Sequence, residues 1–148
     1  MPWPLRDRDQ TRRALEAKLV QGALTEPGQW LVLAMELRAT STVIGEVLLK
    51  WESEVNHQGE IGFAVHSAYQ GLGLAAEAAQ AVLRLGFEGL SLHRVTAVCI
   101  AANTDSVRLL KRLGMRQEAH LRDNVLFKGE WADQLVFGLL EEEWCRHT

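Results

Sequence analysis

Cysteine is scarce in this sequence, and there is no excess of positive charge. The two cysteines, Cys99 inside an apolar run and Cys145 near the end, form neither a disulfide framework nor a metal-binding spacing. The formal net charge of −3 provides no basic field for nucleic-acid phosphates. No early segment combines a basic region with a long apolar stretch, as a targeting signal would. These absences predict a reduced, cytoplasmic protein with no nucleic-acid or membrane partner.

What the sequence does contain is typical of a globular domain. Of its 148 residues, 47% are hydrophobic and 24% are charged, a mixture that can bury a sizeable core. There is no internal repeat, linker-like segment or low-complexity tract. We therefore expect residues 1–148 to form a single domain.

The spacing of apolar residues predicts the order of helices and strands. Recurrence every three or four residues predicts helices, and alternation or short apolar runs predict strands. We expect helices at 7–22, 75–88 and 103–114, and strands at 29–37, 42–51, 59–67, 94–100, 115–122 and 131–144. Asn103 can cap the third helix, and Gly114 can close it in the left-handed conformation. This order indicates a mixed α/β (α+β) fold.

A loop with little side-chain bulk, "YQGLGLAAEA" at residues 69–78, joins the third expected strand to the second expected helix. Such a loop presents several backbone N–H groups and the positive end of a helix to one anion. Proteins hold a pyrophosphate in this way without needing a lysine. A plain tight turn would use the same glycines, so the loop alone leaves both interpretations open.

Two other nucleotide-binding motifs fit this loop less well. A P-loop needs Gly-Lys-Ser/Thr at the helix start, whereas Gly73 is followed by Leu74 and Ala75. "GLGLAA" does fit the dinucleotide fingerprint, but there the first glycine follows its strand directly and an acidic residue ends the next strand. Here "HSAYQ" intervenes, and residues 101–103 contain no acid. A dinucleotide-binding enzyme therefore stays an alternative to a protein that binds another phosphorylated cofactor.

Several motifs resemble one enzyme superfamily. Gln70, Gly73 and Ala75 match the Gln/Arg-x-x-Gly-x-Gly/Ala signature of the Gcn5-related N-acetyltransferases (GNAT), and "NTDSVRLLKRLGM" resembles the Asn-x-x-Ser helix that follows in that superfamily. "GEIGFAV", "LRD" and "FKGEWADQLVFGLLEEEW" are similar to the RimJ/RimL branch, which includes ribosomal-protein alanine acetyltransferases. The resemblance runs from about residue 30 to the end. It implies a mixed, mostly antiparallel sheet with helices on both faces, splayed between the strands at 59–67 and 94–100.

The resemblance also implies acetyl-CoA as the cosubstrate, lying in the splay. The N–H groups of residues 71–75 would bind its pyrophosphate, and the backbone of residues 63–65 would pair with its pantetheine arm like an added strand. Asn103 would contact the pantetheine, although a simple helix cap explains it equally well. The cofactor-binding residues implied are Phe63, Ala64, Val65, Gln70, Gly71, Leu72, Gly73, Leu74, Ala75, Asn103 and Ser106.

The implied reaction is direct attack of a primary amine on the acetyl thioester, with no covalent enzyme intermediate. Ser106 shares one helix face with the leucines that follow it, so it would point inward and protonate the departing thiolate. An ordinary first-turn serine is the alternative. A backbone N–H such as that of Val65 would stabilise the carbonyl oxygen. The amine would be a protein N-terminus, an amino acid or a small amine.

Two glutamates are candidates for the base. Glu60 shares a strand face with Gly62 and Ala64, and Glu52 ends the preceding strand. Each could also be an ordinary surface acid. The five histidines are scattered without a ligand spacing, so no metal is expected. A domain that binds CoA in a regulatory or assembly role, without turnover, is the alternative function.

The start of the chain leads to a further expectation. The RimJ/RimL pattern opens with an extra strand and helix before a segment like "MPWPLRDRDQTRRALEA". Without them, the strand at 29–37 would leave an apolar edge uncovered, a state that proteins generally avoid. We therefore expect a homodimer that pairs or exchanges segments at this edge, or else an N-terminal helix that folds over it.

Overall fold

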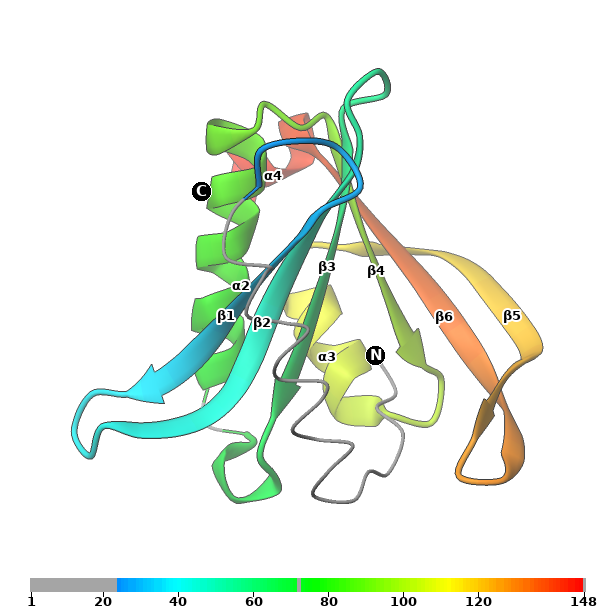
Figure 1. The fold of residues 1–148 in the computed structure, drawn as a ribbon. Helices are drawn as coiled ribbons and strands as arrows, with labels where there is room; N and C mark the ends of the chain where they lie inside the picture. The colour runs from blue at the N-terminus through cyan, green and yellow to red at the C-terminus, as the bar shows by residue number, and fades with distance from the viewer. Residues whose placement is uncertain (1–23, 72, 148) are drawn as a thin grey trace.

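The computed structural model describes residues 24–71 and 73–147, which form a six-stranded mixed sheet in the order β1-β2-β3-β4-β6-β5 (Figure 1). Among these described strands only β3 and β4 run parallel, and every other neighbouring pair is antiparallel. The strands are β1 (Trp30–Leu37), β2 (Thr42–Ser53), β3 (Gln58–Val65), β4 (Arg94–Ile100), β5 (Arg116–Phe127) and β6 (Glu130–Leu140). The mixed, mostly antiparallel sheet expected from the sequence is confirmed.

The described helices include both of the interior helices that the sequence predicts. They are η1 (Ser67–Tyr69), α2 (Leu74–Arg84) with the π-helical turn η2 (Leu85–Gly89), α3 (Thr104–Arg112) and α4 (Glu141–His147). Asn103 caps α3 as expected, because its side-chain oxygen accepts the N–H of Ser106 at 3.1 Å. Gly114, with φ of +86°, takes the left-handed conformation after it. The helix expected at 7–22 lies outside the described residues.

The last strand ends earlier than its sequence pattern suggests. The expectation of a strand over 131–144 is wrong beyond Leu140, where α4 begins. Three acidic residues in the first turn of α4 suit the positive end of a helix, and Glu143 accepts the N–H of Leu140 at 3.0 Å. The turn brings Trp144 against Phe87, with stacked rings whose centroids are 5.2 Å apart. Burial of this tryptophan against η2 therefore favours a helical conformation after Leu140. A continuation of the strand to Trp144 is disfavoured.

The core lies between one face of the sheet and the helices α2, α3 and α4. Figure 1 shows α2 and α3 on the same side of the sheet. Residues on the inward faces of the strands and helices form one buried cluster, whose most completely buried members include Leu49, Ile61, Leu83, Val95, Leu110, Phe137 and Leu139. None of the described helices is long and apolar enough to cross a membrane.

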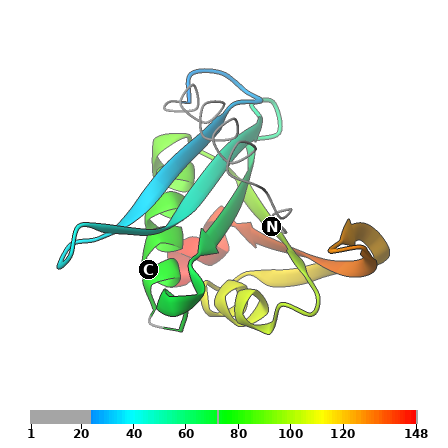
Figure 2. The same cartoon turned by 60° about the horizontal axis from the view of Figure 1, so that its bottom comes forward.

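The sheet is splayed between its two parallel strands. β3 and β4 pair at only three positions, from Gln58 opposite Arg94 to Glu60 opposite Thr96. Beyond that point each strand follows its antiparallel neighbour, since β2 pairs with β3 as far as Val65 and β6 pairs with β4 as far as Ile100. Figure 2 shows the opening that results, with α3 beside it. The splay expected between these two strands is therefore confirmed.

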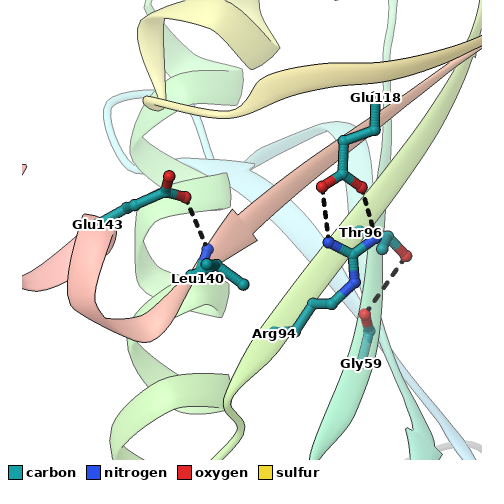
Figure 3. A network of polar contacts seen from close by, with 6 residues as sticks. All are labelled: Gly59, Arg94, Thr96, Glu118, Leu140 and Glu143. Carbon is teal, nitrogen blue, oxygen red and sulfur yellow. Dashed lines mark hydrogen bonds and ion pairs between the residues drawn. The ribbon is translucent and has the colours of Figure 1, made fainter.

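A charged network crosses the closed end of the sheet (Figure 3). The guanidinium of Arg94 on β4 donates to both carboxylate oxygens of Glu118 on β5, at 2.8 and 2.5 Å. The pair spans β6 at Gly138, where an added Cβ would meet a Glu118 oxygen at 2.6 Å. Thr96 makes a weak hydrogen bond, at 3.5 Å, to the carbonyl of Gly59 on β3. Glycine at position 138 thus leaves room for an ion pair that ties the edge strand β5 to β4.

Candidate active site

A cavity of about 410 Å³ lies at the open end of the splay, between β3, the loop before α2, and α3. It is bordered by three segments that are well separated in the sequence. Its lining residues are Phe63, Ala64, Val65, Tyr69, Gln70, Gly71, Gly73, Leu74, Ala75, Ala76, Asn103, Asp105, Ser106, Arg108, Leu109 and Arg112. All the cofactor-binding residues expected from the sequence line this cavity except Leu72, which lies outside the described residues.

Two glycines give the loop before α2 its shape. Gly71 and Gly73 have φ of +79° and +78°, in the left-handed region that other residues rarely adopt. Gly73 is also the N-cap of α2, and an added Cβ there would meet no atom of the described residues within 4 Å. Gln70 donates its side-chain amide to the carbonyl of Val65 at 3.0 Å and so ties the loop to the end of β3. The loop therefore brings a backbone curve and the start of a helix to the cavity wall.

The β3 wall of the cavity is backbone that the splay leaves without a strand neighbour. Past Glu60, no described strand pairs with β3 on its β4 side. On its other side, Gly45 of β2 lies so close that an added Cβ would clash with the Ala64 carbonyl and approach the Val65 Cα to 2.9 Å. Close packing against β2 therefore fixes the part of β3 that contributes Ala64 and Val65 to the cavity.

The first turn of α3 forms the opposite wall. Asn103 uses its side-chain oxygen for the cap and makes no hydrogen bond through its side-chain nitrogen within the described part of the chain. Ser106 is half-buried and lines the cavity together with Leu109, as the inward face expected from the sequence requires. Both polar side chains are therefore available to a molecule in the cavity.

The two candidate bases lie apart from these residues, and neither lines the cavity. Glu60 is at the apex of the splay, in the last β3 position that pairs with β4. Its pKa is raised, first by burial and then by the negative charge of Glu52, and the positive charge of Lys50 opposes the shift. Glu52 is more exposed and forms an ion pair with Lys50 at 3.0 Å. Of the two, Glu60 occupies the more desolvated position.

The structure adds cavity residues that the sequence reasoning missed. Tyr69 comes from η1, and Ala76, Asp105, Arg108, Leu109 and Arg112 come from α2 and α3. The α3 members could have been found from spacing, because residues 105, 108, 109 and 112 follow one face of a helix. Among the described residues no three histidine, cysteine, aspartate or glutamate side chains form a group that could hold a metal ion.

Comparisons with known proteins identify the family to which this fold belongs. The family model for the acetyltransferase (GNAT) domain matches residues 1–116, and the chain belongs to this family. A solved structure of a GNAT-family acetyltransferase from Bacillus anthracis is 30% identical, with a TM-score of 0.78. That match covers 93% of this chain and 77% of the other.

Similar sequences point to the branch expected from the motifs. The uncharacterised N-acetyltransferase YnaD of Bacillus subtilis is 39% identical over 109 residues, which is 73% of this chain and 63% of that protein. The ribosomal protein uS5-alanine N-acetyltransferase of Escherichia coli is 32% identical over 88 residues, 60% of this chain and 45% of that protein. These matches are consistent with a RimJ/RimL-like member. The chain spans less than two thirds of the length of either relative.

Proposed function

We propose that this chain is an N-acetyltransferase domain that transfers the acetyl group of acetyl-CoA to a primary amine. The observation that carries the proposal is the meeting, in one cavity, of an unpaired strand edge and a left-handed glycine loop that starts a helix. An unpaired strand edge suits an extended chain of amide groups, and a helix start suits a phosphate. The pantetheine and pyrophosphate portions of CoA have these two chemistries.

The residues that line the cavity fit the parts of acetyl-CoA. The backbone of Phe63 and Val65 pairs with the amides of the pantetheine arm, whereas Ala64 turns its carbonyl toward Gly45 of β2. The N–H groups of residues 71–75 bind the pyrophosphate, and Gln70 holds that loop against β3. The side-chain nitrogen of Asn103 donates to the pantetheine. When bound, acetyl-CoA supplies a thioester whose C–S bond breaks as the C–N bond to the amine forms.

The two substrates approach from opposite faces of the sheet. Side chains alternate along a strand, so Glu60 and Ala64 share the face directed away from the core, whereas Ile61 is buried on the helix side. Glu60 accepts a proton from the amine, directly or through water. Its raised pKa brings the carboxylate closer to the working range of a general base. The N–H of Val65 donates to the carbonyl oxygen, and Ser106 protonates the thiolate.

For the acceptor, we propose a protein N-terminal amine. The uS5-alanine acetyltransferase among the similar proteins acts, by its name, on a ribosomal-protein alanine, which favours a protein N-terminal amine over an amino acid or a small amine. We further propose that the domain acts in the cytoplasm and as a homodimer.

The test is an acceptor screen. The purified chain is incubated with acetyl-CoA and a panel of N-terminal peptides, amino acids and polyamines, and mass spectrometry detects products heavier by one acetyl group. Free thiol is measured in parallel. We expect acetylation of at least one amine class. Acetyl-CoA binding with no product across the panel would support a CoA-binding domain without turnover.

Single-turnover rates with an amine that the screen identifies distinguish the two candidate bases. Glu60→Gln should lower the single-turnover rate by about 10²- to 10⁴-fold, with little effect on acetyl-CoA affinity. Glu52→Gln is the matched control and should stay near the wild-type rate. The reverse result would assign the base to Glu52.

A further inference from the structure

The α3 wall of the cavity carries two arginines. They belong neither to the glycine loop nor to the β3 edge that the proposed function uses. Arg108 and Arg112 both line the cavity and are four residues apart, so their side chains lie on the same helix face. Ser106 lines the same wall nearer the start of α3, and the helix rises about 9 Å over the six residues from Ser106 to Arg112. The cavity therefore presents a hydroxyl at one end of the α3 wall and guanidinium groups toward the other.

Neither guanidinium is neutralised within the described residues. The ion pairs there engage Lys50, Arg94, Arg116, His120 and Arg146, but neither Arg108 nor Arg112. Among the described residues, Asp105 is the one acid that lines the cavity, and it forms no ion pair with either arginine. Both arginines are exposed, so a ligand group at the cavity mouth could reach them from solvent.

The phosphate groups of CoA carry negative charge that guanidinium groups could bind. The pyrophosphate can be held by the loop and the start of α2, which suit one anion. A second phosphate on the ribose would carry up to about two further negative charges near neutral pH. A chain with a formal net charge of −3 offers no general attraction to it. Planar guanidinium groups are the side chains best matched to a phosphate, because they bind its oxygens in pairs.

We propose that Arg108 and Arg112 bind the ribose 3′-phosphate of CoA and make the site selective for CoA over carriers that lack this phosphate. The inference rests on the proposed function, since it assumes that acetyl-CoA occupies this cavity. It adds a specificity that the glycine loop cannot provide, because dephospho-CoA has the same pyrophosphate and pantetheine.

The experiment measures dissociation constants of the intact chain for acetyl-CoA and for acetyl-dephospho-CoA by isothermal titration calorimetry. We expect the wild type to bind acetyl-CoA at least about tenfold more tightly, as two charge-assisted contacts to one phosphate should give. This preference should shrink as the salt concentration rises, because the guanidiniums are exposed and screened. Equal affinities for the two ligands would overturn the inference.

Variants assign the preference to the two residues. Arg108→Gln with Arg112→Gln should remove the preference by weakening acetyl-CoA binding while leaving acetyl-dephospho-CoA binding nearly unchanged. Lys111→Gln, which removes an exposed positive charge from the same helix outside the cavity lining, should keep the preference. A preference that persists in the double variant, or is lost in the control, would overturn the assignment.

Failure of this inference can be told apart from failure of the proposed function. If acetyl-CoA binds and is turned over with no phosphate preference, the arginine assignment alone is wrong. If neither carrier binds, the proposed function is wrong as well, and the assignment falls with it. Circular dichroism of the double variant checks that it is folded, and the wild-type comparison needs no variant at all.

Discussion

Gly73 combines a backbone requirement with a proposed contact. Its φ of +78° favours glycine whatever binds nearby, and its N–H stands at the start of α2. Replacement by glutamate would add both strain and a negative charge at the expected pyrophosphate position. We therefore expect Gly73→Glu to abolish acetyl-CoA binding, measured by calorimetry, while circular dichroism still reports a folded domain.

Gly28 provides the control for Gly73. It also has a positive φ, +90°, with nothing within 4 Å of an added Cβ, but it lies outside the cavity lining. Gly28→Glu should therefore introduce similar strain and retain acetyl-CoA affinity. Unchanged affinity in Gly73→Glu would remove the loop from the binding site.

Ser106 is half-buried, and its backbone N–H already donates to the helix cap at Asn103. A purely structural serine could be replaced at little cost, whereas a proton donor could not. We expect Ser106→Ala to lower the single-turnover rate by about tenfold to a thousandfold, with a smaller change in acetyl-CoA affinity. Thr104→Ala, at an exposed hydroxyl of the same turn, serves as the control. A wild-type rate in Ser106→Ala would assign the serine a structural role only.

At the scale of elements, edge strand β5 depends on contacts across the sheet. The hydrogen bonds from Arg94 lower the pKa of Glu118, and Glu118 raises that of Arg94. A carboxylate with a pKa below its unfolded value stabilises the fold above that unfolded value, near 4.5. This stabilisation is lost as the pH falls through the folded pKa.

The prediction is that Glu118→Gln lowers the free energy of unfolding at pH 7 by about 1 kcal/mol or less, since the pair is partly exposed. The difference from wild type should shrink as the pH falls below 4.5, because the stabilisation that depends on the charge of Glu118 is lost there. Urea denaturation at pH 7 and at a series of lower pH values measures it. Glu88→Gln, at an exposed glutamate of η2, should show no such pH-dependent difference. A constant difference across the pH range would show that the charge of Glu118 is not the cause.

At the scale of the whole molecule, β1 is the outermost strand of the described sheet next to β2. Leu33 on it is 42% exposed, and Val32 is partly exposed on the opposite face of the sheet. An apolar edge of this kind is a site for strand pairing between two copies. A homodimer through β1 therefore stays our prediction.

Light scattering over a dilution series checks the predicted dimer. We expect the mass of two chains, and a shift toward one chain in Val32→Lys, because a charge on this edge disfavours pairing. Val55→Lys is the control, since Val55 is 88% exposed in the turn between β2 and β3. A mass of one chain at every concentration, unaltered by Val32→Lys, would exclude edge pairing.

Several features could be predicted from the sequence because neighbouring residues decide them. The spacing of apolar residues gave β4 at its observed bounds and α3 to within two residues, and Asn103 and Gly114 marked the two ends of that helix. The loop through Gly73 could be recognised because positive φ and low side-chain bulk are local demands. The sequence pattern misled where strand and helix patterns overlap, as in the four residues after Leu140, which begin α4 instead of extending β6.

Contacts between distant segments decided the splay of the sheet, the ion pair across it and the lining of the cavity. Pairing between β3 and β4 stops after Glu60 because each strand follows its antiparallel neighbour, and the cavity opens only there. The ion pair of Arg94 with Glu118 depends on β6 lying between β4 and β5, with a glycine at the crossing point. Arg108 and Arg112 come to line the same cavity as the glycine loop only once α3 packs beside α2. Local sequence sets the dihedral angles of each segment, whereas strand order and the facing of side chains follow from burying one shared core.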